Sequence, residues 1–125
     1  MKVLLAVESI DLRLALDLFL REQPGALVVG TACTAEGAMA LLRTVGVDLV
    51  VLQWSLPGLP VTELLAEGHT LCQRPHFLIL GTRAADEKPA IVAGADAFAL
   101  LGDSPQKLLN AIESLMPPPA EIPLG

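Results

Sequence analysis

The chain is short of aromatic residues, cysteines and clustered basic residues, and each shortage excludes a class of protein. Only 3% of its 125 residues are aromatic, with no tyrosine, while 53% are hydrophobic, so an aliphatic core is expected. Eight Lys and Arg, scattered singly, stand against 14 Asp and Glu, which gives a formal net charge of −6. Binding to a nucleic-acid backbone needs clustered Lys and Arg. We therefore expect no direct nucleic-acid contact by this domain.

Long apolar runs are also absent. None approaches the roughly 20 residues that a membrane-spanning helix needs. The first apolar run, residues 3–7, is too short and too strand-like for a signal peptide. These absences predict a cytoplasmic location and no membrane contact. Cys33 and Cys72 are expected at opposite ends of a sheet, as reduced structural thiols.

Short aliphatic runs alternate with helical patterns, which is typical of an α/β domain with a buried parallel sheet. The expected strands are residues 3–7, 26–32, 48–53, 76–81 and 96–100. The expected helices are residues 11–21, 34–44 with Thr34 as N-cap, about 60–68, a fourth, and a fifth opening at Ser104-Pro105. Pro89 interrupts the fourth helical pattern, so that helix is expected only after Lys88. Five βα units of this kind form a doubly wound sheet.

Residues 1–116 are predicted to form one domain, and residues 117–125 a proline-rich tail. The prolines of the tail cannot continue a helix and favour an extended conformation. The tail is either a simple terminus or the start of a linker to an output domain, and we favour the linker.

One motif directs the functional interpretation. The segment from Asp48 to Gly58 reads as a buried strand that runs into a loop with Pro57 and Gly58. It resembles the phosphoacceptor segment of response-regulator receiver domains, in which the strand ends in an aspartate and a proline follows four residues later. Here the position of that aspartate is occupied by Gln53. A carboxylate can attack phosphorus and carry an acyl phosphate, whereas a neutral amide does neither.

The resemblance covers nearly the whole chain and implies a flavodoxin-like, receiver-type (βα)5 fold with strand order 2-1-3-4-5. It also implies a degenerate phosphorylation site, whose five positions are Glu8, Ser9, Gln53, Thr82 and Leu101. In receivers, adjacent acidic residues at the first two positions hold magnesium, and a lysine at the last position pairs with the phosphoryl group. Thr82 and Phe98 match the switch hydroxyl and the switch aromatic. Because Glu8 would be the single carboxylate, neither a metal nor another cofactor is predicted.

Simpler interpretations accompany these positions. Trp54 suits ordinary loop packing better than a partner contact. Thr82 is either a retained switch or a strand-end hydroxyl that caps the next turn, and Phe98 fits a half-buried strand residue. His69 and His76 are expected at the opposite end of the sheet, so a catalytic or metal role is not predicted for them.

The first helix has a further feature, on its surface. Its core stripe is predicted as Leu12, Ala15, Leu16 and Phe19. Leu14 and Leu18 then fall on the far side, where a pair at i and i+4 can form an apolar patch. We regard them as a candidate interface, for example of a homodimer; the alternative is that a loop or the fifth helix covers them.

The sequence as a whole favours a pseudo-receiver, a non-phosphorylatable signalling module that contacts a protein partner or an output domain. The alternative is a small-ligand-binding domain that uses the vacated pocket near Gln53, with Ser9 and Thr82 as hydrogen-bonding groups. An enzyme on the same scaffold is a third reading, which fold alone does not exclude. We expect no enzyme, because no convincing nucleophile–base pair is present.

Overall fold

The computed structural model describes residues 1–71 and 73–115. Five parallel strands form one sheet in the order β2-β1-β3-β4-β5, as the resemblance implied. The strands are β1 (Lys2–Ala6), β2 (Leu27–Ala32), β3 (Leu49–Gln53), β4 (His76–Gly81) and β5 (Ala97–Leu100). The helices are α1 (Ile10–Arg21), α2 (Ala35–Thr44), α3 (Val61–Gly68), α4 (Glu87–Ala93) and α5 (Pro105–Leu115), with a 3-10 turn, η1 (Ala84–Asp86), before α4.

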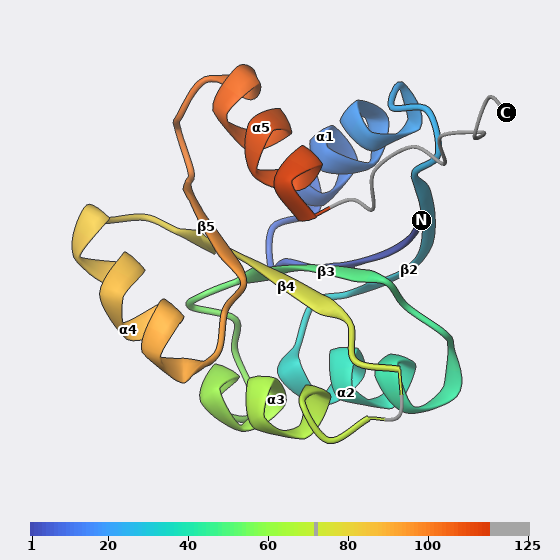
Figure 1. Cartoon of the computed structure of the whole chain (residues 1–125), viewed down its shortest axis with the longest axis vertical. Helices are drawn as coiled ribbons and strands as arrows, with labels where there is room; N and C mark the ends of the chain where they lie inside the picture. The colour runs from blue at the N-terminus through green and yellow to red at the C-terminus, as the bar shows by residue number, and fades with distance from the viewer. Residues whose placement is uncertain (72, 116–125) are drawn as a thin grey trace, which may run out of the picture.

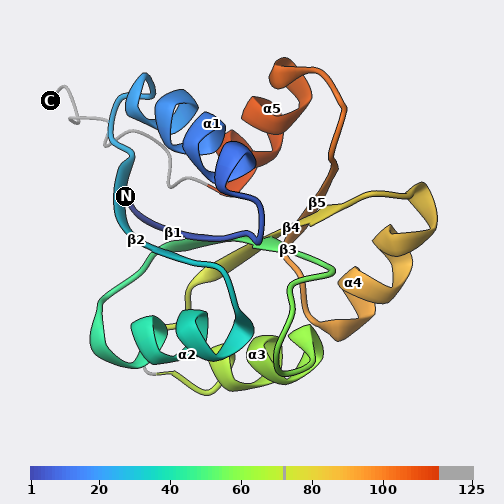
Figure 2. The same cartoon turned by 180° about the vertical axis from the view of Figure 1, so that it is seen from behind.

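The helices cover both faces of the sheet. Helices α1 and α5 lie on one face, and α2, α3 and α4 lie on the other (Figures 1 and 2). Successive strand residues point to opposite faces, so in β1 Leu4 and Ala6 belong to the core beneath α2–α4, while Val3 and Leu5 belong to the core beneath α1 and α5. The three central strands are therefore buried on both faces, which explains their unbroken apolar sequences.

Helix α4 begins earlier than expected. It starts at Glu87, directly after η1, and so includes Lys88 and Pro89. The prediction that it forms only after Lys88 is wrong, because Pro89 is the third helical residue. The first four N–H groups of a helix have no partner inside the helix, so a proline there removes no hydrogen bond.

The core-facing side of α1 is also shifted from the prediction. Leu16 and Leu20 are buried, and Leu12 and Phe19 are partly buried against the same core. Ala15, predicted in the core stripe, is exposed. Because the helix is buried most deeply around Leu16 and Leu20, the stripe is rotated away from Ala15.

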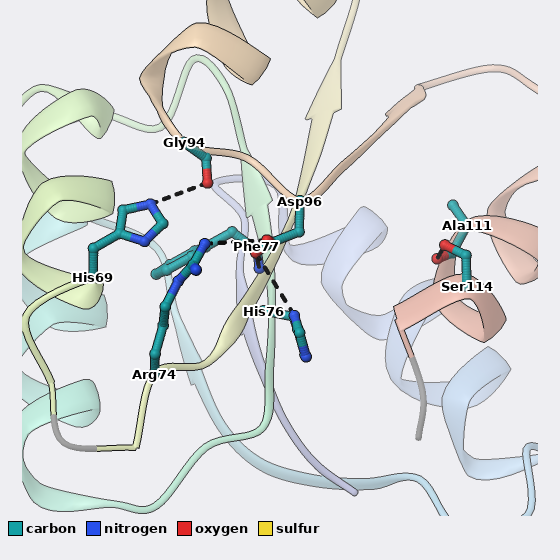
Figure 3. A network of polar contacts seen from close by, with 8 residues as sticks. All are labelled: His69, Arg74, His76, Phe77, Gly94, Asp96, Ala111 and Ser114. Atoms are coloured by element: carbon teal, nitrogen blue, oxygen red, sulfur yellow. Dashed lines mark hydrogen bonds and ion pairs between the residues drawn. The ribbon is translucent and has the colours of Figure 1, made fainter. Parts of the chain in front are cut away.

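The amino edge of the sheet is held by a polar network (Figure 3). The carboxylate of Asp96 accepts hydrogen bonds from the backbone N–H of Phe77 at 2.8 Å and from the guanidinium of Arg74 at 3.2 Å. A ring nitrogen of His69 lies 3.1 Å from the carbonyl oxygen of Gly94. His76 lies at the same edge, with Nδ1 3.9 Å from Asp96. Both histidines thus lie at the predicted end of the sheet and make structural contacts.

Three further expectations concern membrane contact, the two cysteines and the domain boundary. Within residues 1–71 and 73–115, no helix is long and apolar enough to cross a membrane. The predicted cytoplasmic location stays a prediction. Cys33 is exposed just after β2, whereas Cys72 and the predicted boundary at residues 116 and 117 lie outside the described residues.

Candidate functional site at the carboxyl edge of the sheet

The predicted site residues follow four strands at one edge of the sheet. Glu8 and Ser9 follow β1, Gln53 ends β3, Thr82 follows β4 and Leu101 follows β5. The order β1-β3-β4-β5 makes these strands neighbours. Parallel strands present their carboxyl ends at one edge, so the topology gathers the five positions there.

Gln53 fastens two loops together. Its side-chain oxygen accepts a hydrogen bond from the backbone N–H of Glu8 at 2.8 Å, and its Nε2 donates one to Oγ of Ser55 at 3.0 Å. The first bond joins the loop after β1 to the end of β3, across 45 residues of sequence. Both ends of the amide are therefore engaged by the protein itself.

Among the five predicted site positions, Glu8 is the one carboxylate. Glu8 is exposed, and Ser9 is the N-cap of α1, where its hydroxyl accepts from the N–H of Leu12 at 3.3 Å. An N-cap of this kind satisfies one of the unpaired donors at the start of a helix. Across the described part of the chain, no group of three or more His, Cys, Asp or Glu is placed to hold a metal ion.

Thr82 lies in a turn held by a residue that the sequence analysis missed. Asp86 is 7% exposed. Its carboxylate accepts from the backbone N–H groups of Thr82 at 3.3 Å and Arg83 at 3.2 Å, and pairs with the Arg83 guanidinium at 3.4 Å. The side chain of Thr82 is exposed, and the cap of this turn is the Asp86 carboxylate. A capping-box signature needs Ser, Thr, Asp or Asn three positions before the acidic residue; Arg83 stands there instead, so that signature does not identify Asp86.

Phe98 is half-buried, as expected, and its ring lies over Gly81. A Cβ atom at Gly81 would lie 2.5 Å from Cζ of Phe98 and 3.1 Å from Cβ of Asp86. The ring also packs against the core beneath α2–α4. The absence of a side chain at Gly81 is therefore what lets the ring and the Asp86 turn come so close.

Leu101 stands where a lysine is expected, and it joins the apolar core. Its backbone N–H donates to the carbonyl oxygen of Gly81 at 2.8 Å, and its side chain packs beneath α1 and α5. It lines a hollow of about 330 Å³ with residues of α1 and α5, among them Leu12, Ala15 and Leu108. A second hollow of about 140 Å³ lies between α4 and β5, lined by Ala84, Glu87, Phe98, Ala99, Leu100 and Asp103. Gln53 lines neither of them.

Trp54 is half-buried against the core beneath α2–α4. Its backbone N–H donates to the carbonyl oxygen of Leu80 at 2.9 Å. The expectation of ordinary loop packing is confirmed. The structure thus brings Glu8 and Gln53 together through a hydrogen bond, while Leu101 turns to the core on the α1 side.

Comparison with known proteins agrees with the resemblance to response-regulator receiver domains. The chain is 30% identical over 115 residues to the response regulator UvrY of Escherichia coli K12, covering 90% of this chain and 53% of that protein. It is 31% identical over 90 residues to the probable transcriptional regulatory protein SgaR of Hyphomicrobium methylovorum, covering 70% of this chain and 43% of that protein. These similarities support the response-regulator receiver domain family for this chain. The chain spans about half the length of the curated relatives it matches.

Solved structures agree with this family. A two-component response regulator of the LuxR family from Aurantimonas superposes with a TM-score of 0.83 at 26% identity, over 91% of this chain and 83% of that one. A CheY-like receiver domain protein from Methanospirillum hungatei superposes with a TM-score of 0.78 at 25% identity, over 91% and 92%. No protein-family model matches the chain.

Proposed function

We propose that this receiver domain is a pseudo-receiver, which takes no phosphoryl group and acts through protein–protein contact. One observation carries the proposal: Gln53 occupies the position at which the resemblance expects the acceptor, and both ends of its amide are hydrogen-bonded within the protein. A neutral amide is not a nucleophile toward phosphorus. Its oxygen is also committed to the N–H of Glu8.

Two further positions support the same conclusion. Magnesium is usually held by one or two carboxylates together with phosphate oxygens, and Ser9 supplies a helix cap in place of a second acid. A phosphoryl group is stabilised by a cation that pairs with it, and Leu101 supplies apolar packing instead. No chemical step is left for the domain, so we propose a non-enzymatic role.

The relatives indicate the setting. They are a response regulator and a probable transcriptional regulatory protein, and this chain matches about half of the former. We therefore place the domain in a two-component-type or transcriptional regulatory system, next to an output domain or a separate protein partner. Because its basic residues are few and scattered, contact with nucleic acid is assigned to another domain or partner.

Intact-mass spectrometry after incubation with acetyl phosphate and magnesium tests the proposal. The mass of the wild-type chain is expected to stay unchanged. An added phosphoryl group that hydroxylamine removes would show an acyl phosphate and would overturn the proposal. A typical receiver domain incubated in the same tube serves as the positive control.

The small-ligand alternative stays a prediction. Gln53 does not line the hollow beneath α1 and α5 or the hollow between α4 and β5, and its amide already has partners in Glu8 and Ser55. A ligand would have to displace one of these hydrogen bonds or use the remaining lone pair and the remaining N–H of the amide.

A further inference from the structure

The outer face of α1 carries an apolar stripe. Ile10, Leu14 and Leu18 are 63%, 55% and 65% exposed. They stand four residues apart, so they lie on one side of the helix. Leu16 and Leu20 are buried on the opposite side. Over residues 1–71 and 73–115, neither α5 nor any loop buries them. The sequence leaves two alternatives open for Leu14 and Leu18, an exposed patch or a pair covered by α5 or a loop, and in the described part of the chain the two leucines are exposed. Ile10 extends the patch by one turn.

The two ends of this α1 stripe carry opposite charges. Asp11 is exposed in the first turn of α1, and Arg21 is exposed in the last turn. The Arg21 guanidinium lies 3.1 Å from Asp17, with 72% of the Arg21 side chain exposed. An exposed pair of this kind contributes little to stability, so Arg21 is free to take another partner at little cost. Asp11 has no ion-pair partner within residues 1–71 and 73–115.

The apolar and charged residues of α1 complement those of a second α1 helix that runs antiparallel to it. In an antiparallel pair of α1 helices centred at Leu16, Leu14 lies opposite Leu18 of the second copy. The same register places Asp11 opposite Arg21 of the second copy, since both pairs are centred at Leu16. A two-fold axis makes each contact twice. Apolar residues thus meet at the centre of the interface and opposite charges meet at its two ends.

We propose that the α1 stripe binds the α1 stripe of a second copy of this chain in an antiparallel, two-fold homodimer. This rests on the proposed function only in that both assign the domain to protein contact. A single helix pair buries less than the roughly 1,200–2,000 Å² of a standard stable interface. The dimer is therefore weak and reversible, with a dissociation constant in about the micromolar range.

The charge pairs give a test that depends on the register. In Asp11→Lys alone and in Arg21→Glu alone, like charges meet at both ends, and each variant should bind itself at least about tenfold more weakly than wild type. Mixing the two variants brings Lys opposite Glu and Arg opposite Asp, so a heterodimer should form. Analytical ultracentrifugation of each variant and of the equimolar mixture measures this. Val92→Glu is the matched control, because Val92 is 82% exposed on α4, on the other face of the sheet.

The apolar part is tested separately. Leu14→Glu with Leu18→Lys should abolish the dimer and leave the circular dichroism spectrum unchanged, because the core-facing Leu16 and Leu20 are untouched. If that variant unfolds, Leu14→Ala with Leu18→Ala makes the same test without adding charge. A wild-type monomer at about 1 mM, or a mixture of charge variants that stays monomeric, overturns the proposal. Neither result affects the phosphorylation assay, and a phosphorylated chain would not affect the dimer.

Discussion

Two loops at the carboxyl edge of the sheet are fastened by side chains of different charge. After β3, the neutral amide of Gln53 holds the N–H of Glu8 and the hydroxyl of Ser55. After β4, the carboxylate of Asp86 holds the N–H groups of Thr82 and Arg83. The residue at the expected acceptor position is thus neutral, while a carboxylate lies in the turn beyond Thr82, where it acts as a cap. Both loops are held in place without a ligand.

The charged Asp86 and the neutral Gln53 should also differ in how much their hydrogen bonds stabilise the fold. Hydrogen bonds to a charged group contribute about 1.5–3 kcal/mol, against about 0.5–1.5 kcal/mol for neutral pairs. The turn after β4 is also supported by the contact between Gly81 and Phe98. We therefore expect the β4 side of the site to be fastened more strongly than the β3 side.

The largest effect is expected at Gly81. In Gly81→Ala the new Cβ would lie 2.5 Å from the Phe98 ring, and such overpacking typically lowers the free energy of unfolding by about 1–3 kcal/mol. Urea denaturation measures the loss. Gly46→Ala is the control, because the nearest atom to its added Cβ is the flexible Lys2 amine at 4.0 Å.

Phe98→Leu should then relieve part of the loss in a Gly81→Ala background, since the smaller side chain leaves room for the methyl group. A double-mutant cycle measures this coupling. Strictly additive effects of the two substitutions would show that the ring and Gly81 do not constrain each other.

The direct comparison of the two fastening residues comes next. Asp86→Ala leaves two backbone N–H groups without their acceptor and should cost about 2 kcal/mol, whereas Gln53→Ala leaves one and should cost about 1 kcal/mol. Chemical denaturation of both variants measures the difference. Ser55→Ala is the control for Gln53, because it keeps the bond to the Glu8 N–H and should change stability by less than about 0.5 kcal/mol. Equal costs at Asp86 and Gln53 would refute the proposed asymmetry.

Restoring the acceptor alone should restore little chemistry. Gln53→Asp supplies a carboxylate, yet Ser9 and Leu101 still leave the metal with few ligands and the phosphoryl charge unpaired. Adding Ser9→Asp and Leu101→Lys should accelerate phosphorylation about 10- to 100-fold over the single variant, the effect of a charge-assisted contact of about 1.5–3 kcal/mol. Time-resolved intact mass with acetyl phosphate gives both rates. Aspartate is as good an N-cap as serine, so α1 should survive the change, and equal rates would mean that Gln53 alone blocks the reaction.

The sequence predicted the fold well because its signals are local. Blocks of aliphatic residues marked all five strands to within about one residue at each end, and Thr34 marked the start of α2. The prediction of α4 was wrong because a proline is disruptive inside a helix but harmless in its first turn, and the pattern did not show where that turn begins. Ala15 was misplaced because a period of 3.6 residues fixes the apolar side of a helix only approximately.

The candidate site was predicted in its positions but not in its contacts. The spacing to Pro57 located Gln53, and the resemblance to receiver domains located Leu101. The hydrogen bond from Gln53 to Glu8 joins residues 45 apart in the sequence, so it depends on the folded sheet. The packing of Phe98 and Asp86 around Gly81 likewise exists only after β4 and β5 pair.

The central claim is that the site is closed by its own hydrogen bonds and binds neither magnesium nor a phosphoryl group. The backbone amide of Glu8 reports this directly, because its partner is Gln53. In ¹⁵N–¹H spectra recorded during titration with magnesium and a beryllofluoride phosphoryl analogue, we predict no saturable movement of the Glu8 amide or the Trp54 indole signal. A saturable shift of the Glu8 amide signal in the wild type at millimolar or lower magnesium would contradict the account. The control is Glu8→Ala, in which the Trp54 indole signal is followed and a shift caused by metal binding should disappear.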